Sequence, residues 1–241
     1  MARTSRLFLA FAVSAVVSPA LALQSDYSTK ETRALMHAYA RCVVARKPAQ
    51  ASAALLRNVD NGTILREYRT LIIGDCLARE ARATATMSFS GDLYRYALAD
   101  ALVSRELAAH DAPNVSALPR LDHREPKGEP QEVTADGKKL SKKKFEEAKK
   151  DHSQMVAYTF LSRYGECVVR VDVGGAKALL LTAPDSPEET ARFGALRPAL
   201  ARCMPEGETL RFGRTALRGS IAINYYRLGH AARAAATKAA G

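Results

Sequence analysis

Apolar residues recur at helical spacing along most of this 241-residue chain. Leu35, Tyr39 and Cys42 fall at positions i, i+4 and i+7, so their side chains share one face of an α-helix. The same kind of stripe returns in the second half of the chain, at Ala157, Leu161, Tyr164, Val168 and Val171. These stripes predict amphipathic helices that bury one face, with the first cysteine on the buried side.

One stretch of the chain is written twice. Residues 42–102 recur, with changes, as residues 167–225. Each copy begins with Cys-Val-Val, carries a Leu-Leu pair thirteen residues on, reaches a second cysteine, and ends on a Phe that is followed six residues later by an Arg. The matched positions are Cys42 and Cys167, Leu55 and Leu180, Cys76 and Cys203, Phe89 and Phe212, Arg95 and Arg218. We therefore expect an all-α fold of two related three- or four-helix units, residues 23–111 and 141–230.

Caps and breakers predict where the helices begin and end. Residues 28–31 have capping-box form, and so do residues 186–189, where Pro187 would occupy the first helical position. Pro48 and the pair Gly174-Gly175 are predicted to break the chain at matching points of the two copies. Continuous helices are expected over residues 64–76, 90–109 and 186–203, and from about residue 215.

Residues 112–140 interrupt the helical pattern. Four prolines stand there among charged residues with almost no aliphatic periodicity: Pro113, Pro119, Pro126 and Pro130. Such a composition is typical of a flexible, solvated linker, so the two units are predicted to be joined by one. At the other end of the chain, residues 231–241 form an alanine-rich basic tail that is either a frayed helix or disordered.

A run of lysines follows the predicted linker. Its members are Lys138, Lys139, Lys142, Lys143, Lys144, Lys149 and Lys150. One interpretation is a strip that binds a polyanion, such as lipid head groups or another acidic envelope polymer. The other is the exposed start of the next helix, with Glu146 and Lys150 as an i,i+4 pair. Runs of charge are commonly just solvated, which favours the second interpretation.

The first 22 residues have the pattern of a secretory signal. Arg3 and Arg6 precede an apolar run, and Pro19 precedes the small-residue sequence Ala20-Leu21-Ala22. We therefore expect export to the periplasm or secretion. No later segment is long and apolar enough to cross a bilayer. Without the signal, 34 basic and 25 acidic residues leave a net charge of +9, but export makes nucleic acid a poor partner.

The four cysteines are expected to form disulfides, because an exported protein meets an oxidising environment. Four cysteines allow three pairings, and a repeated unit most simply closes on itself. This favours Cys42 with Cys76, 34 residues apart, and Cys167 with Cys203, 36 apart. The alternative, a zinc site, lacks the close cysteine or histidine spacing that zinc ligands show.

Several motifs of the second copy support a resemblance. These are Cys-Val-Val at 167–169, Ser-Pro-Glu-Glu at 186–189, the second cysteine, Leu-Arg-Phe at 210–212 and Leu-Arg-Gly at 217–219. With them the chain resembles a group of secreted, cysteine-containing helical proteins of alphaproteobacteria to which no activity is assigned. The resemblance covers most of the second copy and, more loosely, the first, which departs from it at Tyr94-Arg95-Tyr96 because the glycine is missing. It implies the compartment and the helical fold only.

The sequence predicts no catalytic, metal or cofactor site. Five histidines are scattered along the chain: His37, His110, His123, His152 and His230. His123, beside Asp122 and Glu125, is a weak metal hint. No Gly-x-Ser-x-Gly, P-loop or Cys-x-x-Cys motif is present, so a hydrolase stays only as an alternative.

The matched arginines are the most interesting polar pair. Arg95 and Arg218 stand at the same step of the same predicted helix, and two guanidinium groups could bind a carboxylate or phosphate. The structural alternative is that each bonds to the carbonyl end of a neighbouring helix or to a nearby acid. We favour that alternative, because such a position recurs whenever a fold recurs.

These features lead to one functional hypothesis and one rival, with a hydrolase as the second alternative. The first is a non-enzymatic periplasmic scaffold or interaction protein, with an envelope protein as its partner. The rival is a module that binds an anionic envelope component through the lysine run, with Lys142, Lys143 and Lys144 at its centre.

Overall fold

Helices make up most of the chain, and a long irregular segment joins the π turn that ends at Leu107 to the helix that begins at Lys142. The computed structural model describes residues 30–81, 92–205 and 212–240. Its helices are α1 (Lys30–Arg46), α2 (Pro48–Leu56), α3 (Asn61–Glu67), α4 (Gly74–Ala81), α5 (Leu93–Leu102), α6 (Lys142–Val171), α7 (Val173–Leu180), α8 (Pro187–Ala195), α9 (Arg197–Cys203) and α10 (Arg214–Ala240). A 3-10 turn (Arg69–Leu71) and a π turn (Val103–Leu107) complete the set. No strand forms in these ranges, so the all-α prediction is confirmed.

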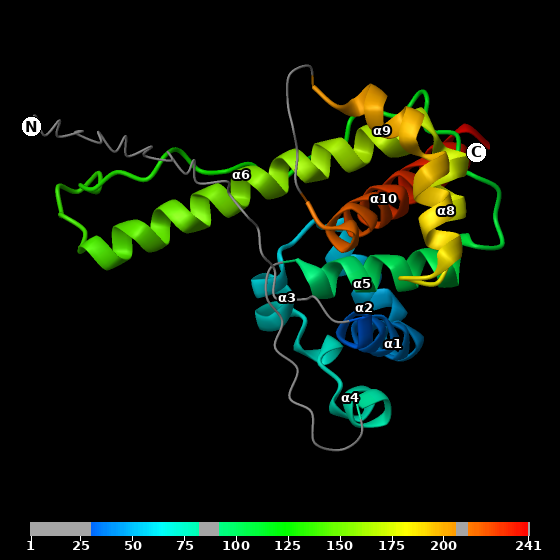
Figure 1. Ribbon diagram of the computed structural model, residues 1–241, viewed down its shortest axis with the longest axis horizontal. Coiled ribbons are helices and arrows are strands. Elements are labelled where there is room, and N and C mark those ends of the chain that lie inside the picture. Colours follow the sequence, from blue (N-terminus) through cyan, green and yellow to red (C-terminus); the bar gives the residue numbers. More distant parts are fainter. Residues whose placement is uncertain (1–29, 82–91, 206–211, 241) are drawn as a thin grey trace, which may run out of the picture.

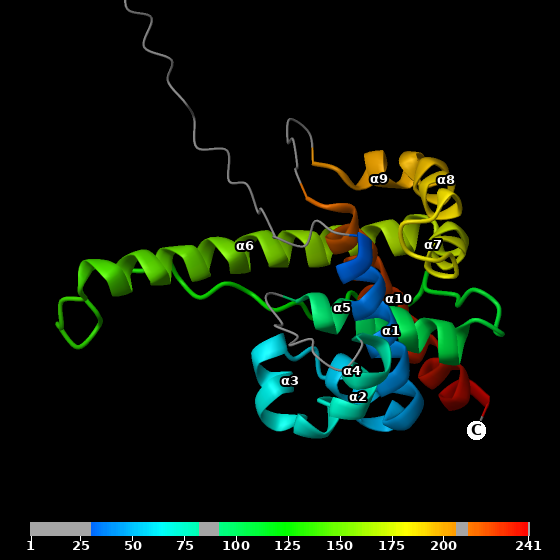
Figure 2. The ribbon, with the colours of Figure 1, turned by 60° about the horizontal axis from the view of Figure 1, so that its bottom comes forward.

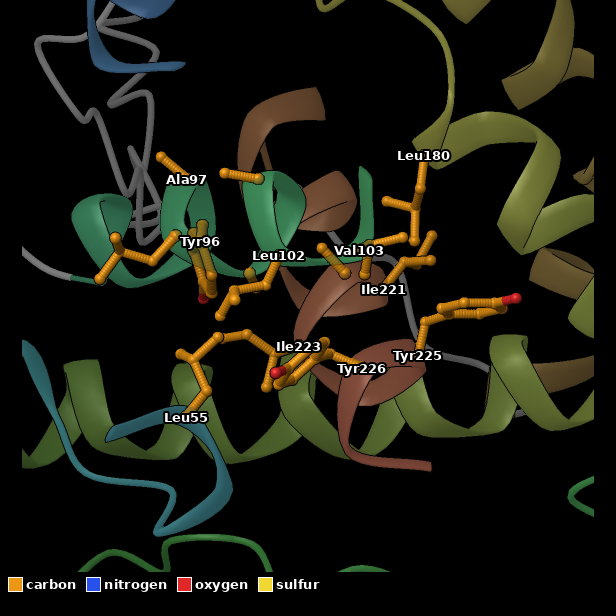
Figure 3. Packing of buried hydrophobic residues seen from close by; sticks show 14 of the residues in the cluster. Leu55, Tyr96, Ala97, Leu102, Val103, Leu180, Ile221, Ile223, Tyr225 and Tyr226 are labelled. Atoms are coloured by element: carbon orange, nitrogen blue, oxygen red, sulfur yellow. The ribbon is translucent and has the colours of Figure 1, made fainter. Parts of the chain in front are cut away.

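The long helices lie side by side and share one core. Helix α5 packs between α1 and α10, and α10 packs between α5 and α6 (Figures 1 and 2). Leu102, the last residue of α5, and Val103, the first of the π turn, lie near Ile221 of α10 in this core (Figure 3). Since α5 belongs to the first half of the chain and α10 to the second, the two halves are joined through a common apolar interior.

The disulfides pair as predicted. Cys42 of α1 is bonded to Cys76 of α4, and Cys167 of α6 to Cys203 of α9, with Cα–Cα distances of 5.7 and 5.8 Å. In each half, the first helix is therefore tied to the fourth. A bridge that closes a loop of this length stabilises the fold by about 4 kcal/mol in the chain-entropy model. The two bridges indicate an oxidising, extracytoplasmic compartment.

The strongest predicted helix start is confirmed, and one predicted break is corrected. The Ser186 hydroxyl accepts a hydrogen bond from the Glu189 N–H at 3.0 Å, with Pro187 at the first helical position. The pair Gly174-Gly175 does not break the chain but lies in the first turn of α7. The break falls at Asp172, whose carboxylate caps α7 by accepting from the Gly175 N–H at 2.7 Å. A Cβ at Gly175 would lie 2.2 Å from that carboxylate, so the glycine makes room for the cap.

The expected continuous helix over residues 64–76 is wrong. The chain instead forms α3, a 3-10 turn and α4. Backbone groups in this stretch bond to tyrosines from other helices: the Leu71 carbonyl accepts from the Tyr94 hydroxyl at 2.5 Å, and the Ile73 N–H donates to the Tyr39 hydroxyl at 3.0 Å. These contacts replace the intrahelical bonds that a continuous helix would make.

The other helix boundaries differ in smaller ways. The helix expected over residues 186–203 divides at Leu196, and Pro198 stands in the first turn of α9, where a missing N–H costs nothing. The helix expected over residues 90–109 begins at Leu93 in the described part and continues as the π turn. The alanine-rich tail continues α10 to Ala240, with residues 233–239 exposed. Ser28 and Thr29 of the first capping box lie outside the described residues, as does the signal pattern of residues 1–22.

None of the described helices is both long enough and apolar enough to traverse a bilayer.

A close contact between α5 and α10 accounts for the missing glycine in the first copy. Gly219 and Tyr96 each follow one of the matched arginines. The Tyr96 ring lies against the Gly219 backbone, and a Cβ at Gly219 would come within 2.1 Å of that ring. One copy therefore supplies the ring and the other the space that it occupies.

We expect Gly219→Ala to lower the free energy of unfolding by about 1–3 kcal/mol, because the added methyl group must displace the Tyr96 ring in a packed interior. Urea-induced unfolding followed by circular dichroism measures the change. Gly194→Ala is the matched control, since nothing lies within 4 Å of a Cβ there and alanine is the better helix former. If the two substitutions have equal effects, the contact between α5 and α10 is not as close as described.

Candidate functional site

Arg218 lies at the centre of a buried network where the two halves meet. The residue is 3% exposed, and its guanidinium group donates to the carbonyls of Leu179, Leu180 and Thr182 at 3.1, 3.0 and 2.9 Å. Leu179 and Leu180 end α7 and Thr182 lies just beyond it, in a region where helix carbonyls run out of intrahelical N–H donors. A cation is also favoured there by the helix dipole.

Two carboxylates complete the partners of Arg218. Asp100 of α5 accepts from its Nε at 3.0 Å, and Glu189 of α8 accepts from its Nη1 at 3.1 Å. Asp100 also lies 3.2 Å from Nδ1 of His37 on α1, so three helices besides α10 contribute a polar side chain. All of the nitrogens of the Arg218 guanidinium group have partners. As the second interpretation of the matched arginines expected, Arg218 bonds to the carbonyl end of a neighbouring helix and to nearby acids.

A shallow cleft opens above this network, between the start of α10 and the helices α1 and α5. Arg33, His37, Thr215 and Arg218 are among the residues that line it. At its edge Arg33 donates to Asp185 at 2.6 and 2.9 Å, and this bond to Arg33 holds the pKa of the Asp185 carboxyl below its usual value. An ion pair that joins the two halves thus lies at the edge of the cleft.

The matched arginine of the first copy has different partners. Arg95 is fully buried and donates to the Tyr158 hydroxyl and to the side-chain carbonyl of Asn58. Among the ion pairs of the described residues, its acidic partner is Asp92, at 3.7 Å. Asn58 follows α2 as Thr182 follows α7, so each arginine bonds the segment after the second helix of its own half. The two arginines have separate partners and do not form a joint anion site in the described structure.

The first half of the expected flexible linker packs on α6. We call residues 113–125 the strap. Arg170 of α6 donates to the strap carbonyls of Val115, Leu118 and Pro119 at 2.9, 3.2 and 2.5 Å. The segment forms no regular secondary structure, and the arginine supplies donors to its backbone carbonyls. The interpretation of this half as solvated therefore needs correction, because its long-range partner was not visible in the local composition.

His123 fastens the end of the strap. Its Nδ1 lies 2.8 Å from the Ser162 hydroxyl, and its Nε2 lies 2.6 Å from the Glu166 carboxylate. A serine, a histidine and a carboxylate in line resemble the chemistry of a hydrolase. Here, however, Ser162 is only 4% exposed, and it shares α6 with Glu166 one turn away. The line therefore attaches the strap to α6.

Glu166 is held as a carboxylate. Burial by itself raises its pKa, but bonds from His123, from the Leu121 N–H and from Arg170 outweigh burial and lower the pKa to about 2. The charge on Glu166 is thus part of what fixes the strap.

The lysine run lies on a projecting arm. Residues 126–155, which we call the arm, include the beginning of α6 and the chain that leads to it, and they extend from the body (Figures 1 and 2). Lys142, Lys143 and Lys144 form the exposed first turn of α6, capped by Ser141. A helix therefore begins within the lysine run, as the second interpretation of that run predicted. Glu146, however, pairs with Lys149 at 2.7 Å and not with Lys150 as expected.

Sequence reasoning missed the partners of Arg218. Asp100 is the single acid in an otherwise apolar stretch of α5, and an acid in such a place needs a cation if it is buried. Glu189 was noted only for its capping position. Within the described ranges, no three His, Cys, Asp or Glu side chains come close enough together to hold a metal ion, and His123 does not meet Asp122 and Glu125 as ligands.

No protein-family model, curated protein or solved structure matches the chain. Its own contacts and exposed surfaces are therefore what supports a function for it.

We expect Arg218→Lys to destabilise the protein by about 2–4 kcal/mol, because an ammonium group keeps the charge but cannot reach three carbonyls and two carboxylates at once. Chemical denaturation measures the loss. Arg192→Lys, at an exposed position of α8, is the control and should change stability by less than about 0.5 kcal/mol. If Arg218→Lys and the parent protein have equal free energies of unfolding, the Arg218 network contributes little to stability.

We expect Glu166→Gln to lower the free energy of unfolding by about 2 kcal/mol at pH 7. The pKa of Glu166 is lowered on folding, so its carboxylate stabilises the protein above the ordinary value of 4.5 and ceases to do so as the pH falls toward 2. The difference in the free energy of unfolding between Glu166→Gln and the parent protein should therefore become smaller from pH 5 to pH 3, as measured by urea titrations. Glu125→Gln, which alters an exposed pair with Arg163, should have little effect at any pH.

Proposed function

We propose that the protein is a non-enzymatic periplasmic scaffold that docks onto a component of the cell envelope through its arm. The observation that carries the proposal is the arm itself. It extends from the body, presents exposed lysines and buries no residue. The two disulfides and the sequence pattern of residues 1–22 support the compartment.

The arm makes little contribution to the core. All buried residues of α6 lie from Thr159 onward, so more than half of this 30-residue helix lies outside the interior. Helices that lack tertiary packing are marginal in water, and most helical stability comes from a buried apolar face. A long projecting segment without such a face is therefore better explained by a contact outside the chain than by folding.

The body supports a scaffold more than an enzyme. The charged groups that meet beneath the cleft, Arg218, Asp100 and Glu189, bond to one another and to the end of α7. Ser162 is buried beneath the strap. The hydrolase alternative thus gains no support from the groups that could have carried it.

The two ends of the arm lie close together on the body, which suggests how to remove it. The Thr159 hydroxyl donates to the Arg124 carbonyl at 2.7 Å, and the Arg124 guanidinium lies 3.9 Å from the centre of the Tyr158 ring. The chain therefore leaves the body and returns to it at neighbouring points. A short Gly-Ser linker in place of residues 127–155 bridges them and keeps the strap contacts.

We expect the intact protein to sediment with envelope membranes and the armless variant to stay in the supernatant, because the arm carries the contact. Unchanged disulfides and helical circular dichroism would show that the variant is folded. A control that neutralises Arg233 and Lys238 on the exposed end of α10 should sediment like the intact protein. Equal sedimentation of the armless variant would disprove docking through the arm.

A further inference from the structure

We infer that the tip of the arm binds a membrane surface rich in anionic lipid head groups. This inference rests on the proposed function and names the chemistry of the envelope component. The basic tip is defined as residues 133–144. It contains five exposed lysines, which are Lys138, Lys139, Lys142, Lys143 and Lys144.

The tip has a concentrated positive charge. Its five lysines fall within seven consecutive positions, residues 138–144, and no acid interrupts them. Asp136 is the single carboxylate of the tip, so its net charge is +4. Of the five lysines, only Lys143 has an acidic partner among the described ion pairs, the exposed Glu147 at 4.0 Å. An exposed ion pair at this distance contributes little binding energy, so Lys143 remains available to an external anion.

A tight turn brings the lysines of the loop next to those of the helix. The Gly137 N–H donates to the Thr134 carbonyl at 2.8 Å, and the Leu140 N–H donates to the Glu132 carbonyl at 2.9 Å. Gly137 has a φ of 78°, a conformation that other residues adopt at a cost. The turn leads directly into the first turn of α6, so both groups of lysines occupy the far end of the arm.

Val133 favours a lipid surface over a soluble polyanion as the partner of the tip. It forms an antiparallel bridge with Lys139, and it is 50% exposed. Residues that face each other across such a bridge project their side chains to the same side. An apolar side chain beside lysines suits the boundary between head groups and acyl chains, whereas a soluble acidic polymer offers nothing for the valine to enter.

The position of the tip suits electrostatic attraction. Fields from anionic lipids extend about 8 Å from the surface at physiological ionic strength, so only charges at the end of a projection benefit from them. Each lysine near such a surface strengthens binding by about fivefold. Neutralising all five should therefore weaken binding by more than about a hundredfold.

The test uses the full chain and sedimented vesicles that contain phosphatidylglycerol in phosphatidylcholine, or phosphatidylcholine alone. We expect binding to the anionic vesicles only, and weaker binding as the NaCl concentration rises. Replacement of the five lysines by Gln should abolish it, and replacement of the same five by Arg, the matched control, should retain it. Val133→Asn should weaken vesicle binding several-fold but leave binding to dextran sulfate unchanged.

Three results would overturn the inference: no binding to anionic vesicles, equal binding by the five-Gln variant, or binding to dextran sulfate without binding to vesicles. They are distinguishable from failure of the proposed function. If the arm is needed for envelope sedimentation but pure vesicles are not bound, docking through the arm stands and the lipid inference falls. If the armless variant still sediments with the envelope, the proposed function itself falls.

Discussion

The ion pair between Arg218 and Asp100 is the contact on which the arrangement of the two halves depends. The residues are 118 positions apart, on α10 and α5, and both are buried. A buried charge without its partner costs several kcal/mol, so any arrangement that separates these helices is strongly disfavoured. Arg218 also bonds the end of α7, and that bond fixes the second half internally. One guanidinium group thus aligns elements from both halves.

The apolar core follows from that alignment. With α5 and α10 held together, the Tyr96 ring fits against the Gly219 backbone, and Ile221, Leu102 and Val103 pack along the same interface (Figure 3). Helix α1 then packs on α5, and α6 packs on α10, each tied to an outer helix by its disulfide. The ion pair supplies register and the apolar contacts supply most of the stability, since a buried pair by itself is seldom strongly stabilising.

Local and repeated features were predictable, and contacts between distant residues were not. The serine cap of α8 and the cysteine pairing followed from spacing within a few residues or within one copy. The division of residues 64–76 was not predictable, because tyrosine hydroxyls from α1 and α5 bond to its backbone. The strap was missed for the same reason: its carbonyls meet Arg170, more than fifty residues away. Of the candidate site, the arginine positions were found, but the acid that pairs with Arg218 across the halves was not.

The difference between the body and the arm decides where a function is to be sought. In the body, the charges that meet at the junction of the halves are matched within the chain, and His123 of the strap bonds to Ser162 and Glu166. On the arm, lysines are exposed and the apolar side chain of Val133 is half exposed. Groups that are already bonded internally have little left to offer a partner, whereas exposed charges at the end of a projection reach a surface before the body does. The physical basis for an external interaction therefore lies in the arm, and the two disulfide-tied halves hold the rest of α6 so that the arm can project.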